Sequence, residues 1–152
     1  MADLHIREAE AADLEAVLSL YRQPDFNGTA GDIDTARGVF DRFRRYPFYR
    51  LHVAKTEGEI VGTFCLLVMD NIARSGTPSA IIESVVVSTE RQGEAIGQAM
   101  MTEAFRIAAE QGAYKICLFT GSNQPHVHAF YERLGFERHG VSYRLELQRR
   151  AA

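Results

Sequence analysis

Residues 84–101, SVVVSTERQGEAIGQAMM, combine an apolar run, a short polar turn and the start of a helix. Such a junction directs several free backbone N–H groups, and the positive end of the helix dipole, toward one point. Gly93 and Gly97 let an anion approach the backbone closely, and Arg91 and Gln92 can add donors. The segment therefore favours phosphate binding, although an ordinary strand-to-helix turn with Gly97 packed on the sheet explains the spacing equally well. The P-loop and G-x-G-x-x-G patterns are absent.

A carboxylate lies just before this segment, because Glu83 interrupts the apolar run IIESVVV. An alkylammonium must lose a proton before its nitrogen can attack a carbonyl, and a carboxylate can accept that proton directly or through water. We expect Glu83 to be a buried general base. The competing interpretation is a structural ion pair, for example with an arginine, or a role in orienting substrate.

Two motifs together resemble the GNAT superfamily of N-acetyltransferases, which use acetyl-coenzyme A (acetyl-CoA). The family pattern Q/R-x-x-G-x-G/A falls on residues 92–97, QGEAIG, and about thirty residues later SNQPHVHAFYERLGF matches a second motif. The second match rests on Asn123, Phe130, Tyr131, Leu134, Gly135 and Phe136. The resemblance is strong from about residue 61 to residue 147, and the N-terminal part agrees only in layout.

The resemblance implies a cofactor site. The pantetheine arm of acetyl-CoA would lie between the IIESVVV and KICLFT strands, which splay apart and leave unpaired backbone groups. The residues expected to bind the cofactor are Val85, Val86, Val87, Arg91, Gln92, Gly93, Glu94, Ala95, Ile96, Gly97, Gln98, Asn123 and Phe130. Asn123 could instead cap the following helix.

Tyr131 occupies the family position whose hydroxyl faces the coenzyme sulfur, which implies a general acid for the departing thiolate. An ordinary core tyrosine with a satisfied hydroxyl is the alternative. One residue departs from the family pattern, because Ala95 stands where the family has glycine. We expect Ala95 to have helical dihedral angles, in which case alanine adds only one methyl group and no backbone strain.

Hydrophobic periodicity indicates the elements that position these residues. Strands are predicted at residues 4–7, 51–56, 60–69, 80–87, 115–120 and 143–147, and helices at 13–21, 33–46, 94–111 and 125–134. They imply a single α/β (α+β) GNAT-like domain over residues 1–152. Its mixed, mostly antiparallel sheet would have about six or seven strands and about four flanking helices, and two splayed parallel strands would form the cofactor cleft.

Composition limits the partners. Seventeen Lys and Arg against twenty Asp and Glu give a net charge of -3, which argues against a dedicated nucleic-acid binder. No apolar run is long enough to span a membrane and the first residues are charged, so we expect a cytoplasmic protein.

Cys65 and Cys117 lie in separate apolar runs and predict buried thiols, and no metal site is expected. The family resemblance implies a homodimer.

The function predicted is transfer of acetyl from acetyl-CoA to a primary amine of a small molecule, peptide or protein, by direct attack in a ternary complex. Acceptor specificity would lie in the loops at 23–32 and 70–79 and in segment 139–143. Asp25, Asp32 and Asp34 suggest a cationic acceptor. A CoA-binding regulatory or interaction module of weak activity is the alternative, because of Ala95. A nucleic-acid or protein-interaction domain around residues 39–50 is a third.

Overall fold

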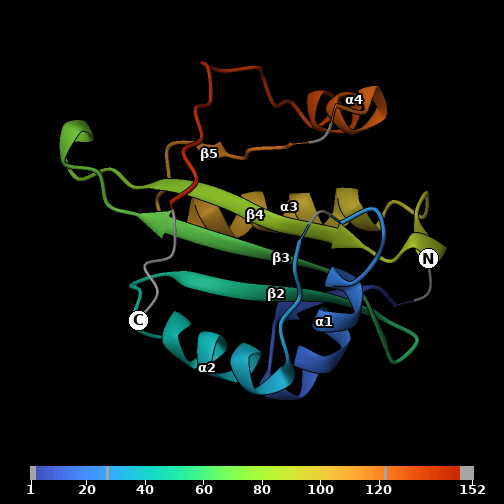
Figure 1. Cartoon of the computed structure of the whole chain (residues 1–152). Helices are drawn as coiled ribbons and strands as arrows, with labels where there is room; N and C mark the ends of the chain where they lie inside the picture. The colour runs from blue at the N-terminus through green and yellow to red at the C-terminus, as the bar shows by residue number, and fades with distance from the viewer. Residues whose placement is uncertain (1–2, 27, 122, 148–152) are drawn as a thin grey trace. The chain divides into compact units, whose positions relative to one another are not determined.

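The computed structural model describes residues 3–26, 28–121 and 123–147. The chain divides into two compact units, residues 1–118 and 119–152. The first contains the sheet and helices α1, α2 and α3, and the second contains helix α4. Figure 1 shows the elements of both units.

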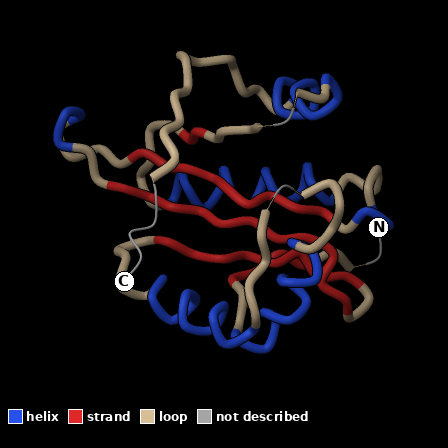
Figure 2. Tube along the Cα trace, viewed as in Figure 1, coloured by secondary structure: helices blue, strands red, loops and turns tan. Residues whose placement is uncertain are grey.

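A five-stranded mixed sheet forms the centre of the first unit, with strand order β1-β2-β3-β4-β5. Neighbouring strands are antiparallel except β4 and β5, which are parallel. Figure 2 shows the strands of the sheet in red. The strands are β1 His5–Glu8, β2 Tyr49–Thr56, β3 Glu59–Met69, β4 Ser79–Val87 and β5 Ile116–Cys117. The mixed, mostly antiparallel sheet is confirmed, but the described residues form five strands instead of six or seven.

The strand predicted at residues 143–147 accounts for the difference. In the second unit this run has no assigned strand, and the side chains that made its alternating pattern are exposed: Tyr143, Leu145 and Leu147. Alternation indicates which residues share a face, but a strand also requires a partner for its backbone groups. The run predicted at 115–120 is likewise a strand only where it has a partner, since only Ile116–Cys117 pairs with β4.

The helices have the predicted order with shifted ends. They are α1 Leu14–Tyr21, α2 Ile33–Phe43, α3 Ile96–Glu110 and α4 Pro125–Arg133. Helix α2 begins after Asp32, whose side chain accepts a hydrogen bond from the Thr35 N–H at 2.8 Å. Among the described residues, no helix combines the length and the hydrophobicity needed to cross a bilayer.

Helices cover both faces of the sheet: α1 and α2 lie on one face and α3 lies on the other (Figure 1). Leu51, Val53 and Cys65 pack beneath α1 and α2. Phe64 is adjacent to Cys65 in β3, so its side chain lies on the opposite face of the sheet, toward α3, where it is fully buried. Gly62 allows α3 to approach, because a Cβ there would lie 2.5 Å from Met100 Sδ.

A β-bulge interrupts β4 next to the predicted base. Glu83 pairs with Cys65, whereas Val86 pairs with Thr63, so β4 contains one more residue than β3 across this interval. The extra residue is accommodated where Ser84 adopts a left-handed conformation with φ of 53°. The β4–β5 ladder is confined to Ala80–Ile116 and Ile81–Cys117, before the bulge. Past the bulge, β4 therefore has no partner strand on its β5 side among the described residues.

Candidate cofactor and catalytic site

The turn that precedes α3 forms a nest of free backbone donors. Gly93 has φ of 89° and Ala95 has φ of 59°, so the chain curls tightly before the helix begins. The first helical hydrogen bond donor is Ala99, which donates to the Ala95 carbonyl at 3.0 Å. In the described part of the chain, the N–H groups of five residues have no acceptor: Gly93, Ala95, Ile96, Gly97 and Gln98. This concentration of donors at a helix N-terminus suits an anion.

The charged and amide side chains of this turn already have partners within the protein. Arg91 Nε lies 2.8 Å from Glu94 Oε2, and Arg91 Nη1 lies 3.4 Å from Glu57 Oε2. The hydrogen bond to Glu94 is the main reason that the pKa of Arg91 is raised. Gln92 Nε2 donates to Asp25 Oδ2 at 2.8 Å. The positive potential of the nest therefore comes mainly from its backbone.

The expectation for Ala95 is wrong. Ala95 is the N-cap of α3 and has left-handed dihedral angles, φ 59° and ψ 12°, instead of helical ones. Its Cβ is crowded against its own backbone there, which costs about 1–2 kcal/mol relative to glycine. The physical reason is the turn, since the chain must reverse curvature between Gln92, which is extended, and Ile96, which is fully buried. The missing family glycine thus falls at a position where glycine would be favoured.

The C-terminal half of β4 provides the second part of the site. Its backbone at Val85 and Val86 has no β5 neighbour in the described residues. The Val87 carbonyl is not free, because Gln23 Nε2 donates to it at 3.1 Å. The Gln23 side chain also accepts from the Thr89 N–H at 3.1 Å. An amide side chain from the loop after α1 therefore bridges the end of β4 and the turn that follows it.

Glu83 lies on the α1/α2 face of β4, opposite Cys65 of β3. Its expected burial is wrong, because the Glu83 side chain is exposed. Among the described residues no arginine pairs with Glu83, and the Tyr49 hydroxyl donates to Glu83 Oε1 instead. An exposed carboxylate with one fixed oxygen has a second oxygen available for an incoming ammonium group.

The second unit contains the other predicted site residues. Tyr131 lies in α4, where its ring contacts Phe130 at 5.1 Å and Phe136 at 5.7 Å, both edge to face. Burial raises the pKa of the Tyr131 phenol, and no group in the described chain bonds its hydroxyl. Asn123 is exposed and precedes the N-cap of α4, which is Gln124, so the capping alternative for Asn123 is not observed.

A family model described as the acetyltransferase (GNAT) family matches residues 14–136. The chain belongs to this family. A glucosamine 6-phosphate N-acetyltransferase of Trypanosoma brucei brucei is 28% identical over 147 residues, which cover 97% of this chain and 98% of that protein. A solved acetyltransferase structure, also from Trypanosoma brucei, has a TM-score of 0.82 at 28% identity, covering 95% of this chain and 100% of that one. A structure described as a transcriptional regulator from Bacillus halodurans C-125 has a TM-score of 0.85 at 26% identity, with the same coverage.

Sequence reasoning missed Gln23 and Tyr49 at this site, and it gave Asp25 a different role, as one of the acidic residues that suggested a cationic acceptor. Gln23 and Asp25 bridge the loop after α1 to the β4–α3 region, and Tyr49 reaches Glu83. No local pattern marks them, because each acts on a residue at least 34 positions away in the sequence. The three acidic residues that suggested a cationic acceptor have structural partners: Asp25 binds Gln92, Asp32 caps α2 and Asp34 pairs with Arg37.

Proposed function

We propose that the protein is an N-acetyltransferase that moves the acetyl group of acetyl-CoA to a primary amine of a small molecule. The observation that carries this proposal is the nest of five unbonded N–H groups before α3, next to a β4 strand whose β5 side lacks a partner strand beyond the bulge. The nest suits a pyrophosphate, and the open β4 edge suits an amide-bearing arm. Both features belong to a chain of the GNAT family.

The proposed reaction is direct attack in a ternary complex. Glu83 accepts a proton from the substrate ammonium group, the amine nitrogen forms a bond to the thioester carbonyl carbon, and the carbon–sulfur bond then breaks. Tyr131 donates its proton to the departing thiolate, and the nitrogen, now part of the amide, gives up its second proton, which returns to the Tyr131 phenolate through water. Burial raises the pKa of the Tyr131 phenol, so the hydroxyl is protonated at neutral pH and has a proton to donate, although it is a weaker acid than a free tyrosine. No covalent enzyme intermediate is required.

Cys65 does not act as a nucleophile in this proposal. The pKa of the Cys65 thiol is raised to about 12, chiefly by burial, so the sulfur is held as a neutral thiol. No cluster of three or more metal-ligating side chains occurs within residues 3–26, 28–121 and 123–147.

Acetylation of a panel of amines, monitored by release of free CoA thiol, tests the proposal. The panel contains glucosamine 6-phosphate, because the Trypanosoma brucei brucei relative bears that name, and also glucosamine, an aminoglycoside, a polyamine and a lysine peptide. We expect turnover with one or more amines and loss of about 10²–10⁴ in kcat in Glu83→Gln. Wild-type kcat in that variant would exclude Glu83 as the base.

A CoA-binding regulatory module is the second candidate, favoured by the strained Ala95 in the nest. Both candidates predict binding, so acetyl-CoA at about 100 times its Kd should add about 2.7 kcal/mol and raise Tm by several degrees. Binding without turnover of any amine would favour the module. The absence of any thermal shift would contradict both.

A further inference from the structure

Tyr49 and Glu83 are brought together across an intervening strand. Tyr49 is in β2 and Glu83 is in β4, with β3 between them. The β3 residue beside Glu83 is Cys65, whose small side chain lies close to Tyr49 and Tyr21. A larger β3 side chain would fill the space that the Tyr49 ring crosses. The sheet therefore leaves a path along which a tyrosine hydroxyl from β2 reaches the predicted base.

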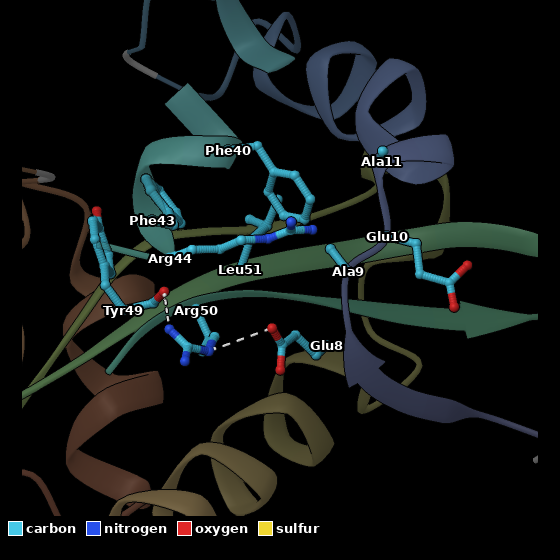
Figure 3. A pocket seen from close by; sticks show the side chains of 10 residues that line it. All are labelled: Glu8, Ala9, Glu10, Ala11, Phe40, Phe43, Arg44, Tyr49, Arg50 and Leu51. Atoms are coloured by element: carbon cyan, nitrogen blue, oxygen red, sulfur yellow. Dashed lines mark hydrogen bonds and ion pairs between the residues drawn. The ribbon is translucent and has the colours of Figure 1, made fainter. Parts of the chain in front are cut away.

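The Tyr49 ring is held from two sides. Phe43 of α2 stacks on it with ring centroids 4.1 Å apart and an interplanar angle of 21°. Tyr46 meets it edge to face at 5.3 Å and 78°. Figure 3 shows Phe43 and Tyr49 side by side at one end of a cavity of about 220 Å³. Rings packed in this way restrict the side-chain rotation of Tyr49 and so fix its hydroxyl.

Glu83, in contrast, is exposed and has no other hydrogen-bond partner in the part of the chain that the structure describes. An exposed glutamate samples several rotamers, and each one places the carboxylate differently. The Tyr49 phenol has a raised pKa, first because of burial and then because of Glu83, so it stays protonated and donates. One Glu83 oxygen is thereby hydrogen-bonded to a hydroxyl group whose side-chain rotation is restricted.

We propose that Tyr49 is a positioning residue that holds the Glu83 carboxylate in the orientation in which it accepts the substrate proton. This inference rests on the proposed function, since it assigns Tyr49 to the same reaction. The hydroxyl of Tyr49 is the functional part, whereas its ring serves packing. A purely structural tyrosine would stabilise the α2–β2 contact and leave the base unaffected.

Steady-state kinetics of Tyr49→Phe, with the best amine of the panel, separate these roles because phenylalanine keeps the ring and removes the hydroxyl. We expect kcat to fall about tenfold with an unchanged KM for acetyl-CoA. Tyr114→Phe is the matched control, since Tyr114 is exposed and its ring contacts are with Arg74 and Lys115. It should keep wild-type kcat.

A double-mutant cycle with Glu83→Gln gives the readout that a structural role would not change. If Tyr49 acts through Glu83, adding Tyr49→Phe to Glu83→Gln lowers kcat no further. Multiplicative losses would show that Tyr49 acts independently of Glu83 and would overturn the proposal.

A second measurement does not depend on turnover. The ¹³C carboxyl resonance of Glu83, identified by its loss in Glu83→Gln, should shift in Tyr49→Phe and stay in place in Tyr114→Phe. An unmoved resonance in Tyr49→Phe would refute the hydrogen bond and the proposal with it. If no amine is acetylated while the resonance does shift, the proposed function fails although the contact exists.

Discussion

Ala95→Gly should make the protein more stable, which reverses the usual effect of glycine at a helix. Ala95 has φ of 59° at the N-cap of α3, so the substitution removes a left-handed penalty of about 1–2 kcal/mol. Glycine also has more conformational freedom in the unfolded chain, which lowers the free energy of unfolding by about 0.4–1 kcal/mol and so offsets part of this stabilisation. The net expectation is a stabilisation of about 0.5–1 kcal/mol, or a rise in Tm of a few degrees.

Ala109→Gly is the matched control, because Ala109 is an exposed residue near the end of α3 whose φ is not positive. The same chemical change should destabilise the protein there, by about 0.5–1 kcal/mol. Urea unfolding at pH 7, followed by circular dichroism, measures both variants under one condition. The two free-energy changes should have opposite signs. A loss of stability in Ala95→Gly comparable to that in Ala109→Gly would refute a left-handed Ala95.

The substitution also has a functional consequence. The methyl group of Ala95 lies in the turn whose N–H groups form the nest, so its removal gives an anion more room. We expect Ala95→Gly to lower the Kd for acetyl-CoA about two- to fivefold, measured by isothermal titration calorimetry. An increase in Kd would show that the methyl group does not obstruct the cofactor.

Three further predictions concern single side chains. Tyr131→Phe should reduce kcat at least tenfold, on the order of a lost general acid, with an unchanged Kd for acetyl-CoA; an unchanged kcat would remove Tyr131 from the reaction. Asp25→Asn removes a carboxylate bound to Gln92 beside the nest and should lower the Kd for acetyl-CoA about fivefold at low salt. High salt should abolish this effect. Equal Kd values for the variant and the wild type at low salt would contradict the prediction. Burial lowers the pKa of His52 to about 4 from 6.5, so its contribution to stability is intact above about pH 6.5 and is lost as the pH falls toward 4. Because of His52, urea unfolding should show a free energy of unfolding about 2 kcal/mol lower at pH 5 than at pH 7. The variant His52→Leu should lack this difference. The control His139→Gln, at an exposed residue, should retain it.

The sequence was sufficient for the parts of the site that are continuous along the chain. The run from β4 through the turn into α3 is local, so its apolar residues, its glycines and the helical spacing after Ile96 predict both the order of the elements and the free N–H groups. The family assignment follows from the same stretch and is confirmed by the match over residues 14–136.

The parts that could not be predicted depend on tertiary contacts or on unusual dihedral angles. Glycine signals a positive φ, but Ala95 carries no such signal and was therefore expected to be helical. The exposure of Glu83 and its contact with Tyr49 depend on where α2 ends and how β2 and β3 pair, across 34 residues of sequence. The apolar alternation at 143–147 indicated a face and could not reveal whether a neighbouring strand exists.

The bulge at Ser84 has a consequence for any survey of substitutions across β4. Before it, odd-numbered residues such as Glu83 share the face of Cys65; after it, the even-numbered Val86 shares the face of Thr63. The pattern of tolerated polar replacements should therefore change phase within a single strand. Deleting one residue at the bulge would restore a uniform alternation, and in doing so it would turn either the carboxylate or the valines that follow it to the opposite side of the sheet.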